Sequence, residues 1–121
     1  MEFKRKQSLP ASFRNAFRGV WLVLQERSFL IQLAAGAIAV TLAFILTLSD
    51  TSRIIIILLT FLVLGAEMFN SAVEYLLDFV KKDHDPDIAR VKDILAGAVM
   101  VFSLSALIIG IWIFGRALGF F

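Results

Sequence analysis

The 121-residue sequence contains no cysteine, one histidine, two prolines and few charged residues, which make up 18% of the chain. The absence of cysteine excludes disulfides, cysteine-ligated zinc, iron–sulfur clusters and thiol nucleophiles. Apolar residues account for 60% of the sequence, whereas soluble domains are about half apolar and about a quarter charged. A chain of this size has no core large enough to bury the surplus, so we expect a small membrane protein. The net charge of +2 is too small to indicate nucleic-acid binding.

Three stretches of the sequence are long and apolar enough to cross a bilayer. Residues 29–48 and 94–114 carry no formal charge, and residues 54–78 begin with an apolar run that continues into polar residues. Twenty helical residues span about 30 Å, the thickness of the hydrocarbon core. Ser49 to Ser52 supply turn and N-cap residues between the first two stretches. We therefore predict three transmembrane helices, with a tight hairpin between the first two.

An amphipathic segment precedes the first predicted span. Its large apolar residues recur at helical spacing: Phe13, Phe17, Val20, Trp21 and Leu24. This pattern predicts a surface helix over about residues 9–27 that lies in the membrane interface, where tryptophan is favoured. Ser8 or Ser12 is expected to cap it. The whole chain, residues 1–121, is then a single all-α membrane domain.

Basic residues are distributed unevenly between the two sides of the predicted topology. Ten of the twelve precede the first span or lie between the second and third: Lys4, Arg5, Lys6, Arg14, Arg18, Arg27, Lys81, Lys82, Arg90 and Lys92. Arg53 and Arg116 are on the other side. By the positive-inside rule, the N-terminus is cytoplasmic and the C-terminus is outside.

The second predicted span carries a polar stripe, formed by Glu67, Asn70, Ser71, Glu74 and Asp78. Their spacing places all five on one side of an α-helix. Glu67 lies about 20 Å along the helix from the outer end, so the stripe begins in the inner half of the bilayer and continues to its surface. Ionisable groups at that depth are costly unless they face protein, water or a cation.

Several functions are compatible with this stripe. Three carboxylates repel one another unless a positive charge lies among them, and oxygen ligands without histidine or cysteine suit Mg²⁺. An intramembrane Glu67 is also typical of a small proton-coupled or cation-coupled transporter subunit. In a third interpretation the stripe only joins helices. Lys92 and Asp93 adjoin the last span at the same membrane level, where Lys92 is suited to offset carboxylates or bind phosphate.

These motifs resemble the bacterial diacylglycerol kinase and undecaprenol kinase family. The resemblance is carried by the segment from Glu67 to Glu74, by Asp78, by the pair Lys92-Asp93 and by the run from Ala96 to Val99. It covers nearly the whole chain. It implies a lipid kinase that transfers the γ-phosphate of MgATP to a lipid alcohol in the bacterial cytoplasmic membrane, and a homotrimeric helical bundle with active sites shared between subunits.

The resemblance also implies residue roles. Glu67 would be the general base, and Glu26 and Glu74 would hold Mg²⁺. The positions expected to bind nucleotide and phosphate are Asn70, Asp78, Lys92 and Asp93. Ser71 and Gln32 are further candidates for contact with the lipid substrate, with helix packing as the alternative for both. The run from Ala96 to Val99 and Pro86 are more similar to the undecaprenol kinase branch, so undecaprenol is favoured over diacylglycerol as substrate.

Overall fold

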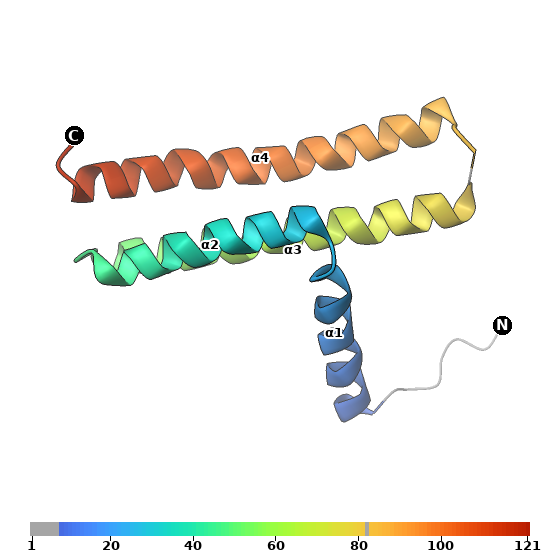
Figure 1. The fold of residues 1–121 in the computed structure, drawn as a ribbon, viewed down its shortest axis with the longest axis horizontal. Helices are drawn as coiled ribbons and strands as arrows, with labels where there is room; N and C mark the ends of the chain where they lie inside the picture. The colour runs from blue at the N-terminus through green and yellow to red at the C-terminus, as the bar shows by residue number, and fades with distance from the viewer. Residues whose placement is uncertain (1–7, 82) are drawn as a thin grey trace.

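A computed structural model of the protein describes residues 8–81 and 83–121, which form four α-helices and no strand (Figure 1). The helices are α1 (Leu9–Val23), α2 (Arg27–Ile45), α3 (Asp50–Val80) and α4 (Pro86–Ala117). The last three are long and apolar enough to cross a membrane, with mean hydropathies of 2.1, 2.1 and 2.5 in their most apolar windows. The predicted all-α fold, with one N-terminal helix and three membrane-length helices, is therefore confirmed.

Capping residues explain where three of the helices begin. Ser8, Ser49 and Asp85 are the N-caps of α1, α3 and α4, and the side chain of each accepts a hydrogen bond from a backbone N–H of the first turn. Pro10 and Pro86 lie in the first turns of α1 and α4, where a missing N–H costs nothing. Of the two predicted caps for the first helix, the structure uses Ser8.

The helix boundaries differ from the predicted ranges. The first helix ends at Val23 rather than 27, α2 ends at Ile45 rather than 48, and α3 extends from Asp50 to Val80. The largest difference is in α4, which begins at Pro86 rather than 94. Hydropathy marks only the apolar part of a helix, whereas the Asp85 cap and Pro86 set its start. Lys92 and Asp93 therefore lie on a helix.

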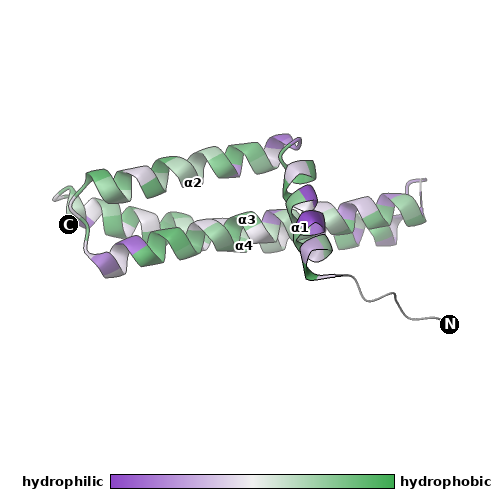
Figure 2. Ribbon diagram, turned by 90° about the horizontal axis from the view of Figure 1, so that it is seen from below, coloured by the Kyte–Doolittle hydropathy of each residue, from purple (hydrophilic) through white to green (hydrophobic). Residues whose placement is uncertain are grey.

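The helices are arranged around α3, which packs against both α2 and α4. Figure 1 shows α3 and α4 side by side along the length of the molecule, with α2 beside one half of α3 and α1 projecting away from the bundle on the side opposite α4. In both views α3 and α4 extend beyond the corner between α1 and α2, and hydrophilic residues are frequent in that extension (Figure 2). The orientation of α1 suits a helix lying in the membrane surface.

Two contacts define the packing of α2. Gly36 faces Thr60 of α3 so closely that a Cβ at Gly36 would lie 2.5 Å from the Thr60 methyl group. Small residues at such crossings let membrane helices approach. One turn earlier in α2, Gln32 donates a hydrogen bond of 3.2 Å from Nε2 to Oγ of Ser103 on α4. This contact gives Gln32 a role in joining α2 to α4.

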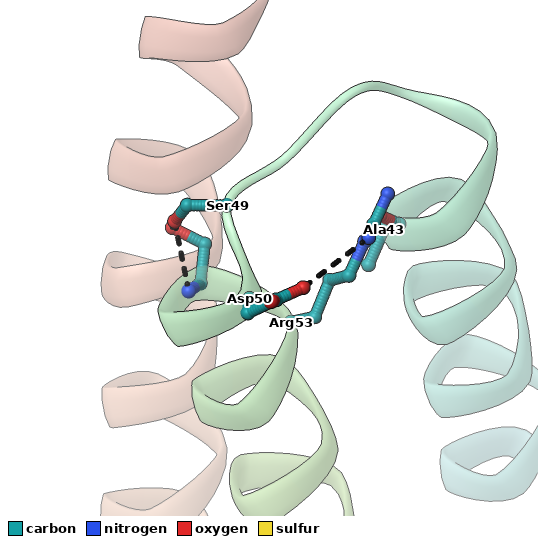
Figure 3. A network of polar contacts seen from close by, with 5 residues as sticks. Ala43, Ser49, Asp50 and Arg53 are labelled. Atoms are coloured by element: carbon teal, nitrogen blue, oxygen red, sulfur yellow. Dashed lines mark hydrogen bonds and ion pairs between the residues drawn. The ribbon is translucent and has the colours of Figure 1, made fainter.

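The hairpin between α2 and α3 is organised by Arg53 (Figure 3). Its Nε donates a hydrogen bond of 3.0 Å to the carbonyl oxygen of Ala43, in the last turn of α2. Its guanidinium also lies 3.6 Å from Asp50 and 5.1 Å from the centre of the Phe44 ring. Arg53 thus satisfies a carbonyl that the end of α2 leaves without a helical partner.

A tight aromatic turn ends α4. Gly119 has a φ of +84°, and the N–H of Phe120 bonds to the carbonyl of Gly115. The chain is thereby turned back, so that the ring of Phe121 stacks on Trp112 with 6.2 Å between centroids. Glycine suits this turn because it adopts positive φ without steric cost.

The fold also separates the basic residues. Arg53 and Arg116 lie at the end of the molecule that holds the α2–α3 hairpin and the end of α4. The basic residues of α1, of the start of α2 and of the α3–α4 connection lie away from that end. Four of the residues counted above, Lys4, Arg5, Lys6 and Lys82, lie outside the described residues. The cytoplasmic location of the basic side stays a prediction.

Candidate functional site

Two polar side chains of α3 are buried in the described part of the chain, Glu67 and Ser71, with exposed fractions of 6% and 8%. They lie one helical turn apart on the predicted stripe. Glu67 makes no hydrogen bond or ion pair with any residue in the described ranges, and its carboxylate oxygens are not among the fully buried polar atoms. A carboxylate at this depth in a membrane helix is costly unless it faces protein, water or a cation, which makes Glu67 a candidate functional residue.

Glu26 reaches this stripe from the corner between α1 and α2. Its Oε2 accepts a hydrogen bond of 2.5 Å from Oγ of Ser71, a residue 45 positions later in the chain. Glu26 is also the N-cap residue of α2, but its side chain makes no capping hydrogen bond. The structure therefore places the Glu26 carboxylate beside Ser71 of the stripe, whereas the shared metal site of Glu26 and Glu74 that the resemblance implied stays a prediction.

At the far end of the stripe, Asp78 pairs with Lys92 of α4, with 2.6 Å between Oδ1 and Nζ. Glu74, one turn before Asp78, also attracts the charge of Lys92. Lys92 is thus the positive group placed between two carboxylates of the stripe. Asp93 is the next residue along α4 but is exposed, and it makes no contact of this kind with the rest of the described chain.

Asn70 lies on the side of the stripe that faces α4. It lines an apolar groove of about 410 Å³ between α3 and α4, together with residues such as Leu95 and Phe102. Its Oδ1 is buried and has no hydrogen-bond partner among the described residues. A buried carbonyl oxygen in that state can accept a hydrogen bond from a ligand or from another chain.

A second groove, of about 540 Å³, separates the α1–α2 corner from α3. Its lining combines polar and apolar side chains: Gly19, Leu22, Val23, Gln25, Glu26, Met68, Ser71, Ala72 and Tyr75. Sequence reasoning missed this groove because its two walls are distant in the sequence. The amphipathic pattern gave no signal for it, because Gly19, Leu22 and Val23 lie on the side of α1 opposite to its apolar face.

The connection between α3 and α4 is held by an ion pair between Lys81 and Asp85. The hydrogen bond from Lys81, supported by one from the backbone of Asp87, holds the pKa of the Asp85 carboxyl below its usual range. Asp85 remains ionised in neutral solution and caps α4. We find a structural role for Asp85 and none for His84.

A comparison with protein families shows how this chain is related to known proteins. The family model for prokaryotic diacylglycerol kinase matches residues 14–114. The chain belongs to this family. The match covers α1 from Arg14 onward, all of α2 and α3, and α4 as far as Phe114. The whole site therefore lies within the match.

Two curated proteins of the diacylglycerol kinase family are similar to the chain. Undecaprenol kinase of Bacillus subtilis (strain 168) is 36% identical over 104 residues, which are 85% of each protein. Diacylglycerol kinase of Synechocystis sp. is 31% identical over 105 residues, which are 85% of this chain and 60% of the relative. The chain is thus a member of a family of membrane lipid kinases, and this membership argues against the transporter alternative.

The side-chain ligands that this diacylglycerol kinase family member offers can be compared with the ligands that Mg²⁺ usually takes. No cluster of three or more acidic or histidine side chains suited to a metal occurs in residues 8–81 and 83–121. Mg²⁺ commonly uses only one or two carboxylates and takes its remaining ligands from water and substrate phosphates. Two carboxylates would therefore be enough for a metal that arrives with a nucleotide, and the assignment of Glu26 and Glu74 as that pair stays a prediction.

Proposed function

We propose that the protein transfers the γ-phosphoryl group of MgATP to the hydroxyl of a long-chain lipid alcohol, at the cytoplasmic surface of a bacterial membrane. The observation that carries this proposal is the burial of an unpaired Glu67 one turn from the Ser71–Glu26 contact. Phosphoryl transfer needs an oriented hydroxyl and compensation of phosphate charge, and it needs no covalent intermediate.

Glu67 is the proposed general base. The alcohol oxygen forms a bond to the γ-phosphorus while the bond from that phosphorus to the bridging oxygen breaks, and ADP leaves. The hydroxyl proton passes to the Glu67 carboxylate. Because Glu67 has no competing partner in the described chain, its oxygens are free to accept that proton.

The nucleotide is proposed to lie further along α3. Glu26 and Glu74 would hold Mg²⁺, which when bound neutralises phosphate charge. Lys92 would bind a phosphate oxygen, and the Asp78 carboxylate would orient its ammonium group. Asn70 and Asp93 complete the proposed nucleotide-binding set, and the free Oδ1 of Asn70 supports its part in it.

The favoured substrate is undecaprenol, with diacylglycerol as the second candidate. Support comes from the Bacillus subtilis relative, which is named undecaprenol kinase and aligns over 85% of its length, whereas the relative named diacylglycerol kinase aligns over 60%. Both substrates would enter from the bilayer. The groove between the α1–α2 corner and α3 is a suitable entrance because it joins apolar side chains to Glu26.

A homotrimer with shared sites is also part of the proposal. The extension of α3 beyond α1 exposes large side chains, with exposed fractions of 80% for Tyr75 and 83% for Phe79. Neighbouring subunits would cover them. The N-terminus would face the cytoplasm and the C-terminus the outside, in accordance with the charge distribution.

The test is an assay of purified protein in detergent with radiolabelled ATP and Mg²⁺. Three parallel assays use mixed micelles that contain undecaprenol, diacylglycerol or no added lipid substrate. We expect labelled lipid with undecaprenol, and less with diacylglycerol. Absence of labelled product with either lipid would contradict the proposed function, and preference for diacylglycerol would contradict only the proposed substrate.

A further inference from the structure

We infer that Ser71 is a positioning residue that fixes the Glu26 carboxylate against α3 for metal binding, and is not a contact for the lipid substrate. This inference rests on the proposed function. It starts from the hydrogen bond of 2.5 Å from Oγ of Ser71 to Oε2 of Glu26.

The hydroxyl of Ser71 behaves differently from three other hydroxyls in the membrane helices. Thr41, Thr60 and Ser105 each donate to the carbonyl oxygen four residues earlier in their own helix, at distances of 2.7, 2.8 and 2.9 Å. That bond is the usual local solution for a hydroxyl within a helix. Ser71 instead donates to a side chain from another segment, so its hydroxyl serves tertiary structure.

Glu26 is equally unusual for its position. An N-cap side chain normally accepts a hydrogen bond from the first turn of its helix. The backbone of Glu26 has the extended conformation of an N-cap, with φ −91° and ψ 130°, yet its side chain caps nothing. The carboxylate turns to α3, where Ser71 supplies the hydrogen bond that capping would have supplied.

This arrangement leaves Glu26 able to bind a cation. Only Oε2 is engaged by Ser71, and Oε1 makes no hydrogen bond or ion pair to a described residue. Hydrogen bonds to a ligating carboxylate orient it and preserve its affinity for metal. The burial of Val23 and Phe29 on either side of the corner, at 6% and 4% exposed, holds the backbone of Glu26 in place.

The same geometry argues against direct substrate binding by Ser71. A serine hydroxyl has one proton to donate, and that proton is committed to Glu26. The oxygens of Glu67, one turn of α3 away, have no partner in the described chain and are left for the lipid hydroxyl.

The experiment compares Ser71→Ala and Ser71→Thr with wild type. Ser105→Ala is the matched control, because it removes a hydroxyl that bonds only within its own helix. Mn²⁺ binding is measured by the loss of the free-ion EPR signal, with detergent-purified protein and a non-hydrolysable ATP analogue. Activity is measured in parallel as a function of Mg²⁺ and of lipid mole fraction.

We expect Ser71→Ala to weaken Mn²⁺ binding and the apparent Mg²⁺ affinity by roughly 10- to 100-fold, the usual effect of losing such a supporting hydrogen bond. The apparent KM for lipid should not change. Ser71→Thr, which retains a hydroxyl, should restore most of the metal affinity, and Ser105→Ala should match wild type.

While wild type remains active, unchanged metal binding in Ser71→Ala would overturn the inference. If the KM for lipid also rose in that variant, Ser71 would instead be a contact for the lipid substrate. An equal loss of metal binding in Ser71→Ala and Ser105→Ala would also overturn it, because the effect would then be general. Inactive wild type with both lipids would instead contradict the proposed function.

Discussion

The ammonium group of Lys92 on α4 lies 2.6 Å from Oδ1 of Asp78 on α3, so this ion pair connects the two long helices near the end where the chain passes from α3 to α4. Both side chains remain accessible, at 35% and 67% exposed. Solvent-exposed pairs of this kind add little to stability. We therefore propose that the Lys92 charge is placed beside Asp78 to bind a ligand.

Lys92→Gln is expected to raise the KM for ATP by about tenfold or more, because a charge-assisted bond to phosphate is lost. The thermal unfolding midpoint should change little. Arg90→Gln is the control, since Arg90 is also a basic residue of α4 but is exposed and lies 4.0 Å from Asp87. Equal effects of the two substitutions on the KM for ATP would argue against a specific role for Lys92.

Glu67→Gln is expected to lower kcat by about 10²- to 10⁴-fold, the usual contribution of a general base. The amide has nearly the same shape as the carboxylate, so nucleotide binding should be retained. Turnover and binding of a fluorescent ATP analogue should be measured on the same preparation. Turnover close to that of wild type would refute the assignment of Glu67.

Gly36→Ala is expected to destabilise the protein by about 1–3 kcal/mol, as overpacking does, because the added Cβ would meet the Thr60 methyl group. The double variant Gly36→Ala/Thr60→Ser removes that methyl and should recover most of the loss. The free energy of unfolding, measured in a detergent mixture, gives both the loss in the single variant and the recovery in the double variant. Gly110→Ala is the control, because no atom lies within 4 Å of a Cβ there.

Arg53→Gln is expected to destabilise the α2–α3 hairpin by about 1 kcal/mol, the usual worth of one hydrogen bond. Kinase activity should be unaffected, because the hairpin lies at the opposite end of α3 from Asp78. Limited proteolysis between Leu46 and Ser49 measures the loosening. A large loss of activity without a change in proteolysis would contradict the purely structural role of Arg53.

Much of the fold follows from local features of the sequence. Apolar runs predict the three long helices, and the spacing from Phe13 to Trp21 predicts α1. The start of α4 was missed because Lys92 and Asp93 interrupt the apolar run, although charged residues continue a helix when they face solvent. The aromatic turn at Gly119 was missed because hydropathy contains no information about positive φ.

The site was less predictable than the fold. The helical spacing of Glu67, Ser71 and Glu74 places them on one stripe, since that spacing is local. The resemblance named Glu26, but only the structure brings its carboxylate to Ser71, because the contact joins segments 45 residues apart. Gln32 was a candidate for lipid contact, and its bond to Ser103 favours the alternative of helix packing.

The projection of α1 away from the bundle has a consequence for substrate choice. In the proposed function, a helix in the membrane surface fixes the height at which Glu26 and Ser71 meet, and a lipid alcohol must present its hydroxyl to Glu67, one turn of α3 away. Selection would then depend on the spacing between the hydroxyl and the start of the hydrocarbon tail. Tail length beyond that point would matter little, since the remainder stays in the bilayer.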